Sequence, residues 1–156
     1  DIQKLVEYRN ISRWVKISTP SIYKKVIQLE EKGLINSVTM KEGKMPEKAV
    51  YSLTEAGERQ FEKLMMEIAG KPIHIFLDFN AVIVNLDSLP ADKQKSCLAN
   101  IEENVAKLKS YLQENILAKE NVPEIPETGM AVLHQQLILA QAIETWITSV
   151  KARLEN

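Results

Sequence analysis

Apolar residues recur at three- and four-residue steps between residues 20 and 32, and this spacing predicts a helix with one buried stripe. The stripe consists of Ile22, Val26 and Leu29. Thr19 can cap the start of this helix, and Pro20 suits its first position, where the missing N–H costs nothing. Gly33 can take the left-handed conformation that ends a helix. The first predicted element is therefore an amphipathic helix with a short, polar and basic outer face.

Two segments beyond this helix, residues 35–40 and 49–53, alternate well enough between apolar and polar positions to predict two strands. Residues 41–48 join them, and Gly43 and Pro46 in this connection suit a projecting tip. A helix, a hairpin of this kind and a second helix, in that order, are the layout of a winged helix-turn-helix. DNA binding is therefore the first function to consider.

The second helix of this layout begins after Thr54, whose side chain can cap it, and three apolar residues are expected to pack it on the domain. These residues are Leu53, Phe61 and Leu64. Gly57 is expected to permit close approach of helix and strand, and Tyr51 to pack or hydrogen-bond within the wing. Residues 70–72 read as a short linker. We therefore predict a winged helix-turn-helix domain at residues 1–70 and an α-helical domain at residues 71–156.

The second half of the chain predicts three further helices. Residues 73–89 are strongly apolar at helical steps, and we predict a helix there, although their β-branched content also permits a strand. The next helix follows Pro90 and runs to Lys119, with an apolar seam suited to an antiparallel or coiled-coil-like partner. The seam is Leu98, Ile101, Val105, Leu108 and Leu112. Residues 121–126, which include two prolines, end this helix.

The last predicted helix, residues 127–154, is apolar on most of its circumference. Such a helix needs cover on several sides, and a partner subunit is the simplest cover. We therefore predict a homodimer with an interface on this helix, and a mainly α fold with a small β-wing and a C-terminal α-helical dimerisation domain. The predicted interface residues are Leu133, Leu137, Ala140, Ile143, Trp146, Ile147 and Val150.

Three groups of residues in the first part of the chain resemble the PadR family of bacterial transcriptional regulators. They are Trp14-x-x-Ile17-Ser18-x-Pro20-Ser21-Ile22-Tyr23, Leu29-Glu30-x-x-Gly33-Leu34-Ile35 and Gly43-x-x-Pro46-x-Lys48-x-x-Tyr51-x-Leu53-Thr54-x-x-Gly57. The resemblance spans residues 2–64, and its second group also occurs in other winged-helix families such as MarR. It implies a dimer that presents two recognition helices to the two halves of a pseudo-palindrome.

The sequence departs from the family pattern in two places. Family members normally carry a full helix before the one that begins near Asp1 and Ile2 here. We therefore expect the first helix of the domain to be missing from this sequence, through truncation or a late start of the numbering. The recognition helix reads Tyr23-Lys24, where many relatives have Pro after the Tyr. The added lysines suit phosphate contact more than base readout.

The charge of the chain is divided by position. The whole chain has a net charge of −1, but residues 10–50 carry eight Lys and Arg against four Glu, a net charge of +4. Residues 70–156 carry eight basic and eleven acidic side chains, a net charge of −3. A solvated surface is the alternative interpretation of the lysines taken alone. Their placement on a helix and a wing tip favours one half that faces nucleic acid and one that faces protein.

The predicted contacts with DNA follow from this layout. Polar side chains at the start of the recognition helix can hold a phosphate together with its free N–H groups, while Tyr23 and Lys24 reach the major groove. The lysines of the wing would meet the neighbouring backbone or the minor groove. The predicted DNA-contacting residues are Lys16, Ser18, Thr19, Ser21, Tyr23, Lys24, Lys25, Lys44 and Lys48.

No pattern in the sequence supports catalysis. His74 and Asp78 are four residues apart, but no third ligand of matching spacing accompanies them, so neither a metal nor another cofactor is predicted. Cys97 has no basic partner nearby in sequence and is expected to be a buried, inert thiol. A single cysteine suggests a reducing compartment, and no secretion signal or long apolar span is evident. A cytoplasmic protein without membrane association is the expectation.

The resulting hypothesis is a sequence-specific regulator of transcription, a repressor that binds double-stranded DNA as a homodimer and is relieved by a small-molecule effector. Four aromatic residues could line a pocket for such an effector or belong to the core. They are Phe76, Phe79, Tyr111 and Trp146. The alternative is a winged-helix protein-interaction or scaffold module without DNA binding. A basic helix and wing discriminate between the two, because an interaction module does not need them.

Overall fold

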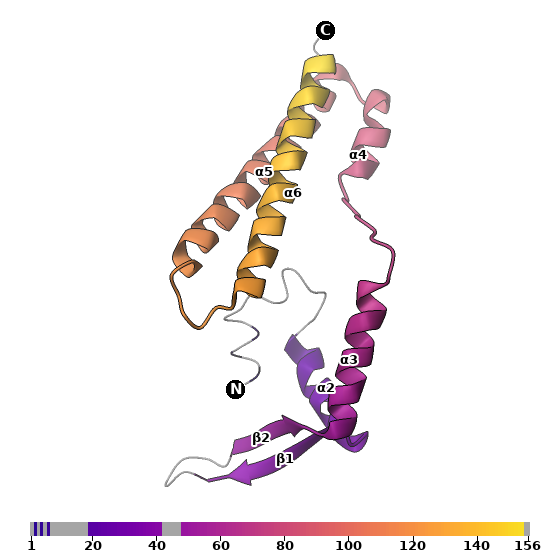
Figure 1. Cartoon of the computed structure of the whole chain (residues 1–156). Helices are drawn as coiled ribbons and strands as arrows, with labels where there is room; N and C mark the ends of the chain where they lie inside the picture. Colours follow the sequence, from indigo (N-terminus) through magenta and orange to yellow (C-terminus); the bar gives the residue numbers. More distant parts are fainter. Residues whose placement is uncertain (1, 3, 5, 7–18, 42–47, 155–156) are drawn as a thin grey trace. The chain divides into compact units, whose positions relative to one another are not determined.

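The computed structural model describes residues 2, 4, 6, 19–41 and 48–154, and the chain divides into two compact units, Asp1–His74 and Ile75–Asn156. In the first unit, helix α2 (Thr19–Glu31) is followed by strands β1 (Ile35–Met40) and β2 (Lys48–Leu53) and by helix α3 (Glu55–Ala69), as Figure 1 shows. The strands pair antiparallel, from Ile35 opposite Leu53 to Met40 opposite Lys48. The predicted order of helix, hairpin and helix is confirmed, and β1 has the predicted bounds.

Helix α2 begins at Thr19, one residue earlier than predicted, so Thr19 lies in the helix and not at its cap. Its end follows the prediction, because Gly33 has a φ of 66°. The Gly33 N–H donates to the Glu30 carbonyl at 2.8 Å and the Leu34 N–H donates to the Leu29 carbonyl at 2.9 Å. This pair of bonds satisfies carbonyls that the last turn would leave open.

The buried stripe predicted for α2 is narrower in the structure. Ile22 is buried and Val26 is half-buried, whereas Leu29 is 37 % exposed. Helix α3 starts as predicted, with the Thr54 hydroxyl accepting from the Gly57 N–H at 3.0 Å. The predicted packing of Leu53, Phe61 and Leu64 is wrong, because all three side chains are exposed. The two-stranded sheet is too small to cover the length of α3, and the described contacts of this helix with the sheet are to β2.

The helix predicted over residues 73–89 is wrong for most of its length. Residues 72–77 have no regular structure, and the helical part consists of α4 (Asn80–Val84) and the short 3₁₀ turn η2 (Leu86–Ser88). The backbone leaves the α conformation at Asn85, whose side-chain amide donates to the Ala81 carbonyl at 2.7 Å. The apolar spacing over residues 79–86 was therefore informative, while the β-branched Ile73 and Ile75 upstream do not join the helix.

Helices α5 (Ala91–Lys119) and α6 (Glu127–Leu154) form an antiparallel hairpin with the predicted bounds, as Figure 1 shows. Four of the five seam residues on α5 are buried, and Ile116 extends the seam by one turn. Leu108 was wrongly included, since it is 44 % exposed. Beside it, Lys109 reaches across to Glu144 with N···O distances of 2.6 and 2.7 Å. A 3.5-residue repeat drifts around a straight α-helix, which moves one predicted seam position away from the partner.

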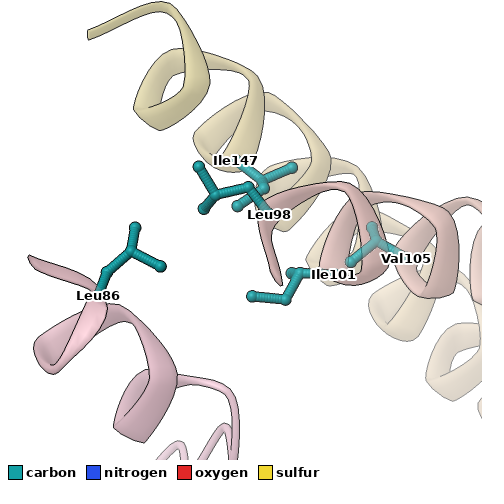
Figure 2. Close-up of a cluster of buried hydrophobic side chains, with 5 residues drawn as sticks. All are labelled: Leu86, Leu98, Ile101, Val105 and Ile147. Carbon is teal, nitrogen blue, oxygen red and sulfur yellow. The ribbon is translucent and has the colours of Figure 1, made fainter. Parts of the chain in front are cut away.

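The apolar core of the second unit lies between this hairpin and the η2 turn. Figure 2 shows Leu98, Ile101 and Val105 of α5 together with Ile147 of α6 and Leu86 of η2. Partly buried residues from α4, α5, α6 and the turn before α4 pack against this cluster: Phe79, Val82, Ile83, Cys97, Ile143 and Val150. Cys97 is half-buried beside the core and thus less buried than the sequence predicted.

Helix α6 has three differently covered faces. One face contacts α5 through the buried Ile147 and through ion pairs of Glu144 and Lys151, and a second face bears Trp146, which stacks on Phe79. The third face is exposed: His134, Ile138, Gln141, Thr145 and Thr148. The cover that we expected from a partner subunit is supplied on two faces by the same chain. No helix in the described part of the chain combines the length and apolarity required to cross a bilayer.

Candidate nucleic-acid interface

The outer surface of α2 carries the polar groups that the sequence placed there. Tyr23 is 76 % exposed, and Lys24 and Lys25 follow it as exposed residues on the same turn. Ser21 is half-buried at the start of the helix. Neither Lys24 nor Lys25 forms an ion pair with another described residue. Their ammonium groups are therefore open to a ligand from the solvent side.

The hairpin adds a second exposed cation to this unit. Lys48 is the first residue of β2, lies opposite Met40 and is exposed. Lys32, directly after α2, and Lys41, directly after β1, are also exposed. Lys16, Ser18 and Lys44 lie outside the described residues, and nothing is described of the Thr19 side chain. Of the predicted DNA-contacting residues, the structure therefore describes the side chains of Ser21, Tyr23, Lys24, Lys25 and Lys48.

A joint between α2, the hairpin and α3 was not recognised in the sequence as a functional feature. The Thr54 hydroxyl donates to the Gly33 carbonyl at 2.8 Å, and the Thr54 N–H donates to the Leu34 carbonyl at 3.1 Å. A Cβ built on Gly57 would lie 2.0 Å from the same Leu34 carbonyl oxygen. This confirms that Gly57 permits close approach, although its neighbour is the loop after α2. The sequence predicted that Thr54 caps α3. It did not predict the bond from Thr54 to Gly33, because these residues are 21 positions apart.

An apolar groove with a volume of about 350 Å³ lies in the second unit. It is lined by Ile75, Leu77, Phe79, Asn80, Leu139, Ala142, Ile143 and Trp146. The Phe79 and Trp146 rings stack with centroids 5.7 Å apart and planes inclined by 23°. Two of the four aromatic residues suggested for a pocket therefore line this groove. Phe76 is 86 % exposed and Tyr111 is half-buried on α5, and neither belongs to the lining.

Among the described residues that line the groove, none is charged, and the polar groups are the Asn80 amide and the indole N–H of Trp146. A concave apolar surface of this size is within the range that small organic ligands occupy. His74 and Asp78 do not share a helix, since the backbone between them has no regular structure. Within the described part of the chain, no three His, Cys, Asp or Glu side chains gather as a metal would require.

The predicted interface residues on α6 are largely engaged within their own chain. Ala140 and Ile147 are 1 % and 0 % exposed, so a second subunit is not needed to cover them. Ile143 and Val150 pack against the core cluster, and Leu133 and Leu137 are half-buried. Trp146 remains 36 % exposed. The large apolar side chains of α6 that are most open to a partner are Ile138, at 63 %, Leu154, at 46 %, and Leu139, at 43 %.

Comparison with known proteins gives a consistent result for the first unit. The family described as "Transcriptional regulator PadR-like family" matches residues 2–63. This family is one of transcriptional regulators and not of enzymes. No curated protein sequence matches the chain significantly.

Solved structures match almost the whole chain. Bacillus subtilis PadR in complex with operator DNA is similar with a TM-score of 0.83 and 20 % identity, over 99 % of this chain and 89 % of that one. The same Bacillus protein in complex with p-coumaric acid gives a TM-score of 0.76 and 17 % identity, over 97 % and 85 %. The Vibrio cholerae virulence activator AphA gives 0.69 and 23 % identity, over 99 % and 88 %. The fold is that of these winged-helix proteins.

Proposed function

We propose that the chain represses transcription by binding a pseudo-palindromic operator as a homodimer, because residues 2–63 match the PadR-like family of transcriptional regulators. The observation that carries this proposal is the exposed Tyr23-Lys24-Lys25 surface of α2 beside a hairpin that presents Lys48. The similar Bacillus protein binds operator DNA with the same fold. Residues 1–70 would read DNA and residues 71–156 would join the subunits, in the cytoplasm of a bacterium.

The two exposed elements have different tasks in this proposal. Tyr23 and Lys24 enter the major groove, where a phenol and an ammonium group can bond base edges and phosphates. Lys25 and the lysines of the wing neutralise phosphates, which fixes the register of the protein on the duplex without reading sequence. Four polar residues that precede or begin α2 in the sequence would hold a further phosphate: Lys16, Ser18, Thr19 and Ser21.

Selection of bound fragments from the source genome, followed by footprinting, tests this function directly. Tyr23→Ala and Lys24→Ala should each weaken binding to the selected operator while leaving the unfolding midpoint within a few degrees, because both side chains are exposed. Lys95→Ala, which removes another exposed lysine, on α5, should change neither property. Unchanged operator affinity in both α2 variants would remove α2 from the interface.

The same assay separates a regulator from a winged-helix interaction module. A DNA-binding protein loses affinity steeply with rising salt, because each neutralised phosphate releases counterions. Replacing Lys44 and Lys48 with Gln should make that slope shallower by about two, if each lysine neutralises one phosphate. A chain with no salt-dependent DNA binding would instead be the interaction module. The similar Vibrio protein is a virulence activator, and reporter transcription distinguishes activation from the repression proposed for this chain.

The homodimer is proposed on the helical unit, with the interface moved from the predicted set to apolar side chains that the chain leaves open. Ile138 and Leu139 on α6 and Leu117 on α5, which is 69 % exposed, are the candidates. Ile138→Lys should sediment as a folded monomer and lose operator affinity, since one half-site alone supplies about half of the contacts. Gln113→Lys on the exposed side of α5 is the matched control. An Ile138→Lys protein that stays dimeric would redirect the interface to Leu117.

A small-molecule effector is proposed for the apolar groove beside Trp146. The similar Bacillus protein binds p-coumaric acid, but none of the described lining residues here is cationic, which favours a neutral aromatic ligand over a carboxylate. In a Trp14→Phe background, Trp146 fluorescence should respond to p-cresol at lower concentration than to p-coumaric acid. Phe79→Ala removes the stacked wall and should abolish the response. Equal responses with and without Phe79 would place the ligand elsewhere.

A further inference from the structure

Three elements of the first unit meet at one side-chain oxygen. The Thr54 hydroxyl donates to the Gly33 carbonyl, at the end of α2, and accepts from the Gly57 N–H, in the first turn of α3. The residue before Thr54, Leu53, is the last of β2 and pairs with Ile35, the first of β1. A threonine hydroxyl has one proton to donate and two lone pairs to accept. Both capacities of this oxygen are thus used to join separate elements.

The surrounding contacts leave little room for the joint to rotate. The Thr54 N–H donates to the Leu34 carbonyl at 3.1 Å and so extends the strand ladder by one residue toward α2. Gly57 lies against the same Leu34 carbonyl, so closely that a Cβ could not be accommodated. Gly33, whose left-handed conformation ends α2, directly precedes Leu34. The end of α2 therefore belongs to the joint.

A second contact ties α2 to the hairpin away from Thr54. The Ser37 hydroxyl on β1 donates to the Glu30 carboxylate in the last turn of α2. Both of these residues are exposed, and so is the bond from Thr54 to Gly33, whereas the bond from the Gly57 N–H to Thr54 is half-buried. The Thr54 joint differs from the Ser37 contact because one hydroxyl joins α2, the end of β2 and α3.

We propose that the Thr54 hydroxyl is a positioning group that holds α2 and the β1–β2 hairpin at one angle, so that Lys24 and Lys48 engage the same duplex together. This inference rests on the proposed DNA binding. When two contacts belong to one rigid body, the second forms without a further ordering cost. When the joint is loose, the free energy needed to order the hairpin opposes the contact of Lys48 with the duplex. Helix α2 then binds without that contact.

The test separates this positioning role from simple capping of α3. Thr54→Val keeps the shape and removes both bonds, and Thr54→Asp keeps an acceptor for the Gly57 N–H but has no proton for the Gly33 carbonyl. Lys48→Gln should weaken operator binding in the parent protein and should have no effect in either Thr54 background. In Thr54→Val and Thr54→Asp, the slope of log affinity against log salt concentration should become shallower by about one for each wing lysine that no longer contacts a phosphate. Thr54→Ser retains the hydroxyl and should restore the effect of Lys48→Gln.

Several controls make the outcome unambiguous. Ser96→Ala removes a comparable hydroxyl, which donates to the Asp92 carbonyl at 2.8 Å on α5, and should leave affinity and salt slope unchanged. All affinities are measured at a temperature at which circular dichroism shows that each variant is folded. If Lys48→Gln weakens binding by the same factor in the parent and in Thr54→Asp, the hydroxyl only caps α3 and the proposal is overturned. If the parent protein itself shows no salt-dependent DNA binding, the proposed function fails instead.

A readout without DNA tests the geometry itself. Spin labels on Ile27 of α2 and Val38 of β1, both exposed, report the distance between the two elements in a Cys97→Ser background. The distance distribution should be narrow in this reference protein and in Thr54→Ser, and broader in Thr54→Asp. An equally narrow distribution in all three would show that other contacts fix the angle, and would also overturn the proposal.

Discussion

Among the residues that the structure describes, eight apolar side chains are buried in the unit Ile75–Asn156, whereas those buried in the unit Asp1–His74 are Ile22 and Ile35. The unit Ile75–Asn156 relies on side-chain packing between long helices. The unit Asp1–His74 has a joint that relies on hydrogen bonds and backbone contact at Gly33, Thr54 and Gly57. Close packing restrains many atoms of the helical unit at once, whereas each directional hydrogen bond restrains the angle between two elements. The difference suits a packed scaffold in Ile75–Asn156 and a unit that holds exposed side chains at a fixed angle in Asp1–His74.

The largest effect is expected from a substitution that introduces a charge into the core of the packed unit. Ile147→Lys places an ammonium group in a fully buried site between α5 and α6 and should lower the free energy of unfolding by on the order of 4 kcal/mol. Thermal unfolding followed by circular dichroism measures this loss. Thr148→Lys, the exposed neighbour, should be nearly neutral. Equal midpoints for the two variants would contradict the assignment of Ile147 to the core.

The joint should respond strongly to one methyl group. Gly57→Ala forces a Cβ against the Leu34 carbonyl and should cost about 1–3 kcal/mol through displacement of α3. It should also weaken DNA binding, because the displaced helix shifts Thr54. Gly129→Ala in α6 is the matched control, since its Cβ would meet no atom closer than 3.8 Å and alanine favours a helix. A Gly57→Ala protein as stable as the control would show that the joint can relax.

A smaller effect is expected from the ion pairs across the helical hairpin. Lys109 and Glu144 are about one-third exposed and lie 2.6 Å apart, so a double-mutant cycle with Lys109→Ala and Glu144→Gln should give a coupling of about 0.5–1 kcal/mol. The coupling should decrease as salt is raised, because part of the pair faces water. A coupling that is insensitive to salt would indicate that packing of the side-chain stems, and not charge, joins the two helices.

The smallest effect is expected on the open side of α5. The pKa of Glu103 is lowered from its ordinary value of 4.5 by the hydrogen bond from Lys107 and by the charge of that lysine. A lowered pKa in the folded state adds stability above the unfolded pKa, and this is lost as the pH falls through the folded pKa. Both side chains are largely exposed, so water screens the pair. Lys107→Ala should return the Glu103 pKa, measured by NMR titration, to its ordinary value without a detectable change in unfolding midpoint.

Local physical chemistry alone determined many element boundaries. Gly33 ends α2 because only glycine adopts its positive φ at low cost, and Thr54 caps α3 because its hydroxyl reaches a free N–H three residues ahead. The period of apolar residues determined the bounds of α5 and α6, since one face of each helix must be buried. The exposed Tyr23 and Lys24 were likewise predictable, because they lie off the buried stripe.

Contacts between residues distant in sequence were decided only by the tertiary structure. Periodicity showed that α6 needed cover on several faces, but cover by α5, by residues 75–79 or by a second subunit leaves the same pattern in the sequence. For the same reason the seam wrongly included Leu108, and Ala140 and Ile147 were assigned to a dimer interface although their own chain buries them. The bond from Thr54 to Gly33 joins two loops whose approach depends on the whole hairpin. Backbone preferences act over a few residues, whereas packing and hydrogen-bond partners depend on how the complete chain folds back on itself.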